Sequence, residues 1–192
     1  MLIETNAFYV MLLKRAPYTP PQQPRIGGEV VPHQDSSFLF TTPLSCIGIW
    51  LAIEDATCTN GCLWALPGSH KGVLARRFVR APDGGVTFNK PAGDWPIEDG
   101  VALEVRAGTL VVLHGQLVHW SSENTSAVSR HAYSMHIVDG ATEYARDNWY
   151  AMVFSDMHVV PCVTTGCSVT RRCPLSQWWL WLRQHNQAKV IS

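Results

Sequence analysis

Residues 30–36 of the chain read Val-Val-Pro-His-Gln-Asp-Ser, and the rest of the sequence is organised around this stretch. Side chains of an extended chain alternate between its two faces, so His33 and Asp35 point in the same direction. A further histidine from a distant strand would complete the two-histidine, one-carboxylate set that binds non-haem iron. A hydrogen-bonded surface pair is the alternative interpretation, and only residues further along the chain can decide between the two.

Two histidines downstream could supply the third ligand. His114 and His119 each end a short apolar run within residues 108–120, and a Gly-Gln turn separates the two runs. We choose His119, because Arg130 follows it by eleven residues across a polar linker whose composition fits a hairpin return.

The segment that begins at Arg130 alternates as a strand does. Arg130, Ala132, Ser134 and His136 share one face, and bulkier side chains occupy the other. An arginine that points into a small barrel needs an anionic partner, because burying an unpaired guanidinium is costly, and its planar fork suits a carboxylate. For Arg130 considered alone, a salt bridge to an Asp or Glu of the chain is the alternative.

Five motifs of this sequence occur together in a fixed order. They are Gly-Gly-Glu-Val at 27–30, His33-x-Asp35, Trp-Leu-Ala-Ile-Glu-Asp-Ala-Thr at 50–57, Asn-Gly-Cys-Leu-Trp-Ala-Leu-Pro-Gly-Ser-His at 60–70, and His119 followed by Arg130. This combination resembles the phytanoyl-CoA dioxygenase family of Fe(II)/2-oxoglutarate oxygenases, and within it most of all the phytanoyl-CoA dioxygenase domain-containing proteins. The resemblance extends from about Gln23 to Trp149.

The resemblance implies an iron site held by His33, Asp35 and His119. It also implies an oxygenase that consumes dioxygen and 2-oxoglutarate, forms succinate and carbon dioxide, and hydroxylates a C–H bond of a small organic or acyl substrate. Arg130 would bind the distal carboxylate of 2-oxoglutarate. The residues that the resemblance assigns to the co-substrate are Arg130, Trp50, Ser121 and Gln34.

From Gly27 onward the sequence has the rhythm of an antiparallel β-protein, with short apolar runs between Gly, Pro, Asn and Asp turn signals. We expect strands near 29–31, 37–41, 46–54, 62–66, 101–105, 109–113, 117–120 and 130–138. Eight short strands predict a double-stranded β-helix, the jelly roll or cupin architecture, which encloses a small-ligand cavity. Residues 71–100 break the rhythm and predict a long loop, whose basic residues form a solvated face or meet an anionic substrate.

Length and composition restrict the class of protein. At 192 residues with 46% hydrophobic composition, the chain suits one domain with a real core. Lys+Arg and Asp+Glu both total 15, so the zero net charge gives no electrostatic case for nucleic acid. We find no apolar run long enough to span a bilayer and no signal-peptide pattern, and we expect a cytoplasmic protein.

Six cysteines could indicate a disulfide framework or a zinc site. We discount the framework, because the chain is large for such a scaffold and nothing indicates secretion. We discount structural zinc, because the cysteines lack paired Cys-x-x-Cys spacing.

We divide the chain into an atypical N-terminal segment 1–22, the jelly-roll domain 23–149 and an atypical Cys/Trp-rich tail 150–192. Prolines in the first segment forbid a regular central strand, whereas the family has further residues upstream that help to close the barrel. The tail lacks strand rhythm, so we expect it to lie outside the barrel. Its Trp-rich run at 177–183 is expected to promote self-association.

Two functions therefore remain as hypotheses. The leading one is an Fe(II)/2-oxoglutarate-dependent dioxygenase acting on a small molecule, with activity impaired by truncation at the N-terminus. The alternative is a non-catalytic metal- or 2-oxoglutarate-binding jelly-roll remnant. Zinc-dependent hydrolysis uses similar ligands, but Arg130 has no role in it.

Overall fold

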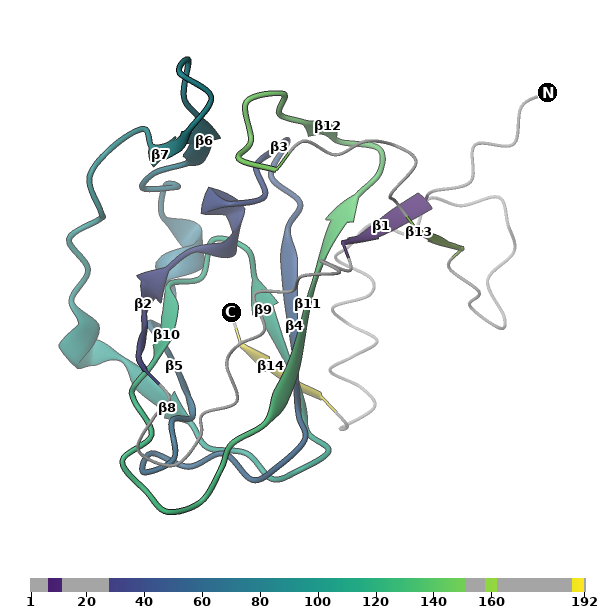
Figure 1. Cartoon of the computed structure of the whole chain (residues 1–192). Coiled ribbons are helices and arrows are strands. Elements are labelled where there is room, and N and C mark those ends of the chain that lie inside the picture. Colours follow the sequence, from purple (N-terminus) through teal and green to yellow (C-terminus); the bar gives the residue numbers. More distant parts are fainter. Residues whose placement is uncertain (1–6, 12–27, 151–157, 162–187, 192) are drawn as a thin grey trace.

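Two β-sheets lie face to face in this computed structural model, which describes residues 7–11, 28–150, 158–161 and 188–191 (Figure 1). The larger sheet has the strand order β13-β1-β11-β4-β9-β14 and the smaller one β2-β10-β5-β8. The larger sheet comprises β1 (Ala7–Met11), β4 (Ile47–Ala52), β9 (Leu110–His114), β11 (Ala132–Asp139), β13 (His158–Pro161) and β14 (Ala188–Ile191). The smaller sheet comprises β2 (Val30–His33), β5 (Leu63–Ala65), β8 (Val101–Leu103) and β10 (His119–Ser121).

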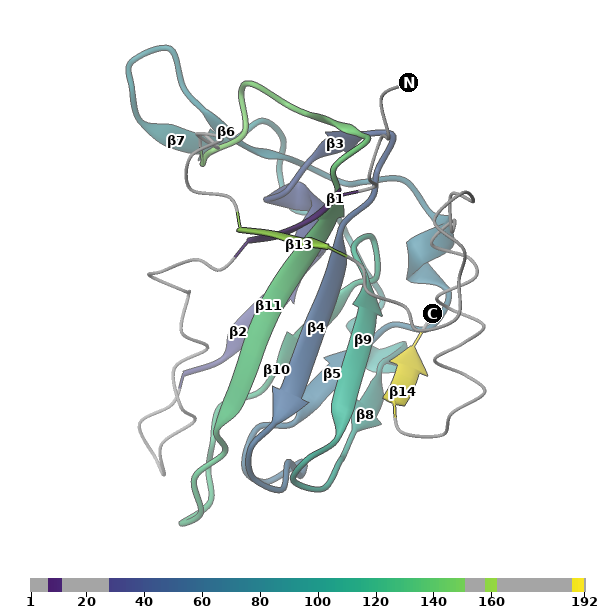
Figure 2. The same cartoon turned by 90° about the vertical axis from the view of Figure 1, so that its right-hand side faces the viewer.

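This double-sheet arrangement is the jelly roll that the sequence predicts (Figure 2). All the expected strands but one are present, with bounds within about two residues of the prediction. The prediction of a strand at 37–41 is wrong. Residues Asp35–Ser37 instead form a 3-10 turn, η1, closed by a bond from the Phe38 N–H to the Asp35 carbonyl. Backbone bonds hold this turn, including one from the Ser36 N–H to the Gly115 carbonyl of a distant loop, and no side chain caps it.

The expected hairpin between His119 and Arg130 is also not formed. β10 pairs with β2 and β5 in the smaller sheet, whereas β11 pairs with β1 and β4 in the larger one. The linker between them therefore crosses from one sheet to the other. Asn124 closes a polar turn within it, donating to the Val128 carbonyl and accepting from the Ser126 N–H.

The core lies between the two sheets, and β4 shows how the sequence forms it. This strand is central in the larger sheet, and its burial alternates so that Gly48, Trp50 and Ala52 face inward. Trp50 packs with residues from both sheets, including Val111 of β9 and Leu63 of β5. The same inward face of β4 lies next to the candidate site.

Residues 71–100 form a long excursion that carries a small hairpin of β6 (Phe78–Arg80) and β7 (Val86–Phe88). Two of its cations are engaged by the protein itself: Arg77 bonds to Asp147, and Arg80 donates to the Arg146 carbonyl. The remaining described elements are the pair β3 (Thr41–Thr42) and β12 (Glu143–Tyr144), and the 3-10 turns η2 (Ser69–Lys71) and η3 (Ile97–Asp99). None of the helices described is long and apolar enough to cross a membrane.

Two stretches of the C-terminal tail join the larger sheet, so the expectation that the tail lies outside the barrel is wrong for them. β13 pairs with β1 at one edge, and β14 pairs in parallel with β9 at the other. Unpaired edge strands can recruit a further strand from their own chain regardless of hydrophobic rhythm, which the sequence pattern does not reveal. The expectation that segment 1–22 holds no regular central strand is wrong for Ala7–Met11, because β1 lies upstream of the prolines and pairs with β11 on one side and β13 on the other. The Trp-rich run at 177–183 lies outside the described residues, and the domain boundaries at 22 and 149 stay predictions.

Candidate metal centre

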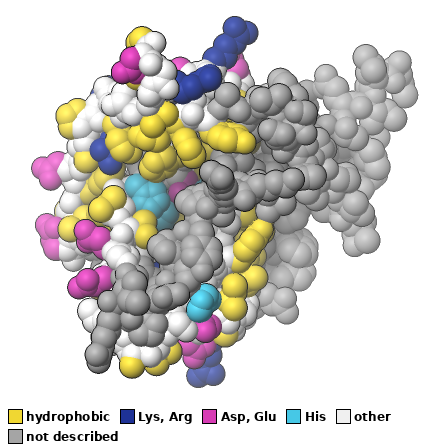
Figure 3. Space-filling model, in the orientation of Figure 1, with side chains coloured by type: hydrophobic (Ala, Val, Ile, Leu, Met, Phe, Trp, Pro, Cys, Tyr) yellow, Lys and Arg dark blue, Asp and Glu magenta, His cyan; other side chains and the backbone are white. Residues whose placement is uncertain are grey.

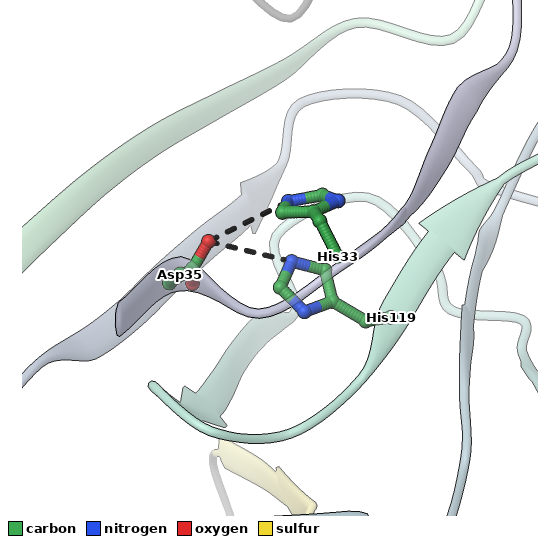
Figure 4. A group of neighbouring side chains, drawn as sticks. All are labelled: His33, Asp35 and His119. Carbon is green, nitrogen blue, oxygen red and sulfur yellow. Dashed lines mark ion pairs between the residues drawn. The ribbon is translucent and has the colours of Figure 1, made fainter. Parts of the chain in front are cut away.

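The structure brings His33, Asp35 and His119 together between the two sheets (Figure 4). Asp35 Oδ1 lies 3.6 Å from the Nε2 atom of His33 and 3.6 Å from the Nε2 atom of His119. One ligand atom from each residue falls within 4.8 Å of the other two. This is the His-x-Asp pair completed by a distant histidine that the sequence predicts.

Local backbone geometry explains the convergence. β2 ends at His33 and η1 begins at Asp35, but Gln34 between them keeps extended angles of φ −118° and ψ 129°. The period-two alternation thus continues for one residue beyond the strand, and the two side chains share a face. His119 enters from the neighbouring strand, because β10 pairs with β2 in the register His119↔His33.

The competing histidine, His114, does not join the group. Its ring lies 5.3 Å from that of His70, and its Nδ1 atom accepts a bond from the Gln116 N–H. The choice of His119 over His114 therefore agrees with the positions of the side chains.

Hydrogen bonds to the backbone put the two imidazoles in the tautomer that a metal requires. The Nδ1 atom of His33 lies 2.8 Å from the Val31 carbonyl, and that of His119 lies 3.0 Å from the Leu117 carbonyl. A carbonyl oxygen only accepts, so both Nδ1 atoms carry a proton, and Nε2 is the nitrogen of each ring that points to the centre and can serve as a ligand.

Electrostatics favour the ligand protonation state for Asp35 and His119, whereas for His33 burial is outweighed by the interaction with Asp35, which raises the pKa of His33 above the ordinary 6.5. Burial alone raises the pKa of Asp35, but attraction to His136 and His119 outweighs burial and holds that pKa well below its usual range. Burial lowers the pKa of His119 to about 4, despite the neighbouring carboxylate. Near neutral pH the group thus contains an ionised carboxylate and a neutral His119 imidazole.

Arg130 lies on the interior side of the larger sheet, two residues before β11. It is 0% exposed, and none of its three guanidinium nitrogens has a hydrogen-bond partner among the described residues. Its guanidinium carbon sits 5.5 Å from the Trp50 ring centroid, and burial lowers the pKa of Arg130 to about 10. The alternative of an internal salt bridge is therefore not supported within the part of the chain that is described.

The other residues predicted to contact the co-substrate differ in whether their polar atoms already have hydrogen-bond partners. Ser121 Oγ and Trp50 Nε1 are buried polar atoms without a hydrogen-bond partner in the described structure, so both remain available to a ligand. Gln34 is different, because its amide donates to the Gln116 carbonyl and accepts from the Ala75 N–H. These bonds fasten the start of the long excursion to the barrel. They weigh against a co-substrate contact for Gln34, which stays a prediction.

Two residues of the centre were missed as site residues. His136 of β11 places its Nε2 atom 3.2 Å from Asp35 Oδ1, closer than either predicted ligand. Gly48 of β4 lies opposite His136 in the register of the sheet. The alternation of the strand from Arg130 onward already put His136 on the inward face, and this was the signal available for it.

An aromatic cluster lies beside the centre. The Phe38 ring packs 6.0 Å from the His33 ring, and Phe78 and Phe88 of the small hairpin pack at 5.7 and 5.9 Å from Phe38. Figure 3 shows hydrophobic side chains gathered next to a histidine on this face. We call Phe38, Phe78 and Phe88 the aromatic wall.

A sequence model of the phytanoyl-CoA dioxygenase family matches residues 5–132. The chain belongs to the phytanoyl-CoA dioxygenase family. Its relatives include the phytanoyl-CoA dioxygenase of Arabidopsis thaliana, 52% identical over 143 residues that cover 73% of this chain and 50% of that protein. The phytanoyl-CoA dioxygenase domain-containing protein 1 of Bos taurus is 49% identical over 133 residues, covering 67% of this chain and 46% of the relative. The chain thus spans about half the length of these family members.

Solved structures resemble this family member over a similar part of the chain. The non-heme alpha ketoglutarate dependent carbocyclase SnoK from nogalamycin biosynthesis aligns with a TM-score of 0.52 and 27% identity, covering 66% of this chain and 49% of that one. EvdO2 from Micromonospora carbonacea var. aurantiaca, complexed with 2-oxoglutarate, aligns with a TM-score of 0.50 and 24% identity, covering 66% and 51%. The second likeness supports the fold alone.

Proposed function

We propose that the protein is an Fe(II)/2-oxoglutarate-dependent dioxygenase that hydroxylates a carbon of a small organic or acyl substrate. One observation carries the proposal: a two-histidine, one-carboxylate group shares the barrel interior with a fully buried arginine that has no partner in the described chain. The first feature suits a divalent metal, and the second requires an anion. Family membership supports the same reaction class.

The donor set fits iron on the chemistry of its atoms. His33 and His119 each bond through Nδ1 to a backbone carbonyl and so direct Nε2 to the centre, and Asp35 presents an ionised oxygen. Three such ligands leave coordination positions open, which is the arrangement of non-haem iron oxygenases. Iron bound there would let dioxygen act as the oxidant, with two electrons coming from 2-oxoglutarate as it is oxidised to succinate and carbon dioxide and two from the substrate C–H bond. The protein residues themselves hold the ligands, exclude water and orient the two substrates.

The anion site fits a dicarboxylate such as 2-oxoglutarate. Arg130 offers a planar fork of donors in a buried environment, where a charge-assisted pair is strong. Trp50 Nε1 and Ser121 Oγ are further unpaired buried donors, and Ser121 lies on β10 two residues from His119. We infer that Arg130 binds the carboxylate far from the metal, and that the two neighbouring donors complete its hydrogen bonds.

The aromatic wall indicates what the other substrate presents to the metal. Phe38 and its two partners give the His33 side of the centre an apolar surface. Arg76 stacks over Phe88 at 3.6 Å, and Arg77 stacks over Phe40 at 4.1 Å. These cations are engaged with rings, so an apolar carbon skeleton is the feature that the wall recognises.

The test is an anaerobic titration of the chain with Fe(II) and then with 2-oxoglutarate, followed by the weak visible charge-transfer band of the chelate. The band should appear with the chain and be absent from His119→Ala. Succinate formation with candidate substrates would then separate an oxygenase from a binding remnant. The same assay on a chain that carries a family-type N-terminal extension shows whether the upstream region is needed for turnover. No band with a folded chain would refute the proposal.

A further inference from the structure

A third imidazole faces the carboxylate of the candidate metal centre. His136 of β11 places its Nε2 atom 3.2 Å from Asp35 Oδ1, whereas His33 and His119 lie at 3.6 Å. The His136 side chain is 23% exposed, compared with 5% for that of Asp35. His136 thus sits on the more open side of the group. It is not one of the residues whose ligand atoms all lie within 4.8 Å of one another.

The hydrogen bonding of His136 differs from that of the two predicted ligands. His33 and His119 each give their Nδ1 proton to a backbone carbonyl two residues earlier, which leaves Nε2 free for a metal. In the described part of the chain, no such carbonyl holds the Nδ1 atom of His136. Its Nε2 atom lies 3.2 Å from a carboxylate oxygen, which only accepts, so a hydrogen bond across this distance needs the proton on Nε2. The geometry makes His136 a donor to a ligand instead of a ligand.

Gly48 confines the same carboxylate from the other side. It pairs with His136 across β4 and β11. A Cβ atom at position 48 would lie 2.5 Å from Asp35 Oδ2, so only glycine leaves room for that oxygen. Oδ2 has no hydrogen-bond partner among the described residues. The Asp35 carboxylate is therefore packed with Oδ2 against the Gly48 backbone and Oδ1 toward the three imidazoles.

We propose that His136 is a positioning residue whose Nε2–H bond fixes Asp35 as a single-oxygen ligand. Gly48 supplies the space that this orientation needs. The inference rests on the proposed function, and it adds a residue of this chain to the shell around the metal. A carboxylate held through one oxygen leaves more coordination positions open than one that can swing to bind through both. Partners of this kind orient metal ligands, and their loss costs about 10–100-fold in metal affinity.

The matched test compares His136→Gln with His136→Asn, using Co(II) as the probe. The glutamine amide nitrogen can reach the position of Nε2, whereas the asparagine amide ends near the position of Nδ1. We expect His136→Asn to weaken Co(II) binding by about 10–100-fold and His136→Gln to stay within about threefold of the parent. The d–d absorption spectrum of bound Co(II) should keep its shape in His136→Gln. Rescue by the longer amide is a result that a merely structural role would not give.

Controls separate the possible failures. His114→Asn replaces a histidine of β9, a strand of the same sheet, that does not face Asp35, and it should bind Co(II) as the parent does. Melting temperatures show that each variant is folded, and His136→Leu is the second removal variant if His136→Asn does not fold. Equal Co(II) affinity in the parent and the removal variant would overturn the inference. So would a His136→Gln variant that binds as weakly as the removal variant with a changed spectrum, because the imidazole would then be a ligand. A folded parent that binds no Co(II) would count against the proposed function itself.

Discussion

Replacing Arg130 with methionine should stabilise the protein without ligand and abolish its recognition of a distal carboxylate. The side chain is 0% exposed and has no described partner, and its pKa falls from the ordinary 12.5 to about 10 because of burial. At 1.36 kcal/mol per unit, the lowered pKa corresponds to a cost of about 3 kcal/mol for keeping the guanidinium charged. A cation with a lowered folded-state pKa destabilises the fold at every pH below about 10.

The change in folding stability follows from the destabilising effect of the buried guanidinium charge. Methionine has a stem of similar length and no charge, so Arg130→Met removes the cost at neutral pH and keeps much of the packing. For a chain of this size, each kcal/mol moves the melting temperature by roughly 2–4 °C. We expect the variant without 2-oxoglutarate to melt up to about 6–12 °C higher than the parent.

Binding of 2-oxoglutarate, by contrast, should become weaker in Arg130→Met. Losing one partner of a buried, hydrogen-bonded charge pair costs about 2–5 kcal/mol. At 1.4 kcal/mol per factor of ten, this weakens 2-oxoglutarate binding by on the order of 30-fold to several thousand-fold. A monocarboxylate analogue such as 2-oxobutyrate lacks the distal group, so its affinity should hardly change in Arg130→Met.

Isothermal titration of the metal-loaded protein with both ligands measures this difference directly. Arg130→Lys is the control that keeps the charge but loses the planar fork, and it should fall between the parent and Arg130→Met. The reasoning is refuted if Arg130→Met binds 2-oxoglutarate within about threefold of the parent, or loses affinity for both ligands equally. The second result would mean that Arg130 supports the metal centre and does not bind the distal carboxylate.

Three further predictions concern the metal centre and the edges of the larger sheet. His119→Ala should abolish Co(II) binding in equilibrium dialysis while His114→Ala retains it, and the reverse result would reassign the third ligand. Gly48→Ala should weaken Co(II) binding at least tenfold, because its Cβ would lie 2.5 Å from Asp35 Oδ2; unchanged affinity would show that the carboxylate has freedom to move. Ending the chain at Trp149 removes β13 and β14, and should lower the melting temperature while leaving Co(II) affinity intact, since the described ligands lie on β2, η1 and β10. Loss of Co(II) binding by the folded truncated chain would contradict this separation.

Much of the fold could be predicted because it depends on local sequence patterns. The strands that carry His33, Trp50 and His119 lie in short apolar runs between turn signals, within a few residues of the observed bounds. The strand predicted at 37–41 is wrong, because backbone bonds, one of them to the distant Gly115 carbonyl, hold a turn at Asp35–Ser37 that hydrophobicity does not indicate. Tail pairing failed for another reason: which edge a distant strand joins depends on tertiary packing that a single sequence does not report.

The site was predictable in its ligands but not in the residues that support them. The spacing of His-x-Asp predicts a shared site, since side chains two residues apart on an extended chain point to the same face. His136 and Gly48 act on Asp35 only through the pairing of β4 with β11, which brings together residues far apart in the sequence. Gln34 shows the opposite failure. It sits between two ligands, but the same alternation turns its amide away toward Gln116 and the long excursion.

The eleven-residue spacing from His119 to Arg130 reflects a crossing between the two sheets, whereas the sequence suggested a hairpin. The linker is no hairpin, because β10 belongs to the smaller sheet and β11 to the larger one. The smaller sheet and η1 carry the three metal-ligand candidates, while Arg130 and Trp50 stand on the side of the larger sheet. Since each sheet holds one half of the site, the fixed length of the crossing keeps the proposed anion anchor in reach of the metal centre. The same division explains why the core between the sheets matters for chemistry: its packing sets the separation between the metal ligands and the residue that would hold the far end of the co-substrate.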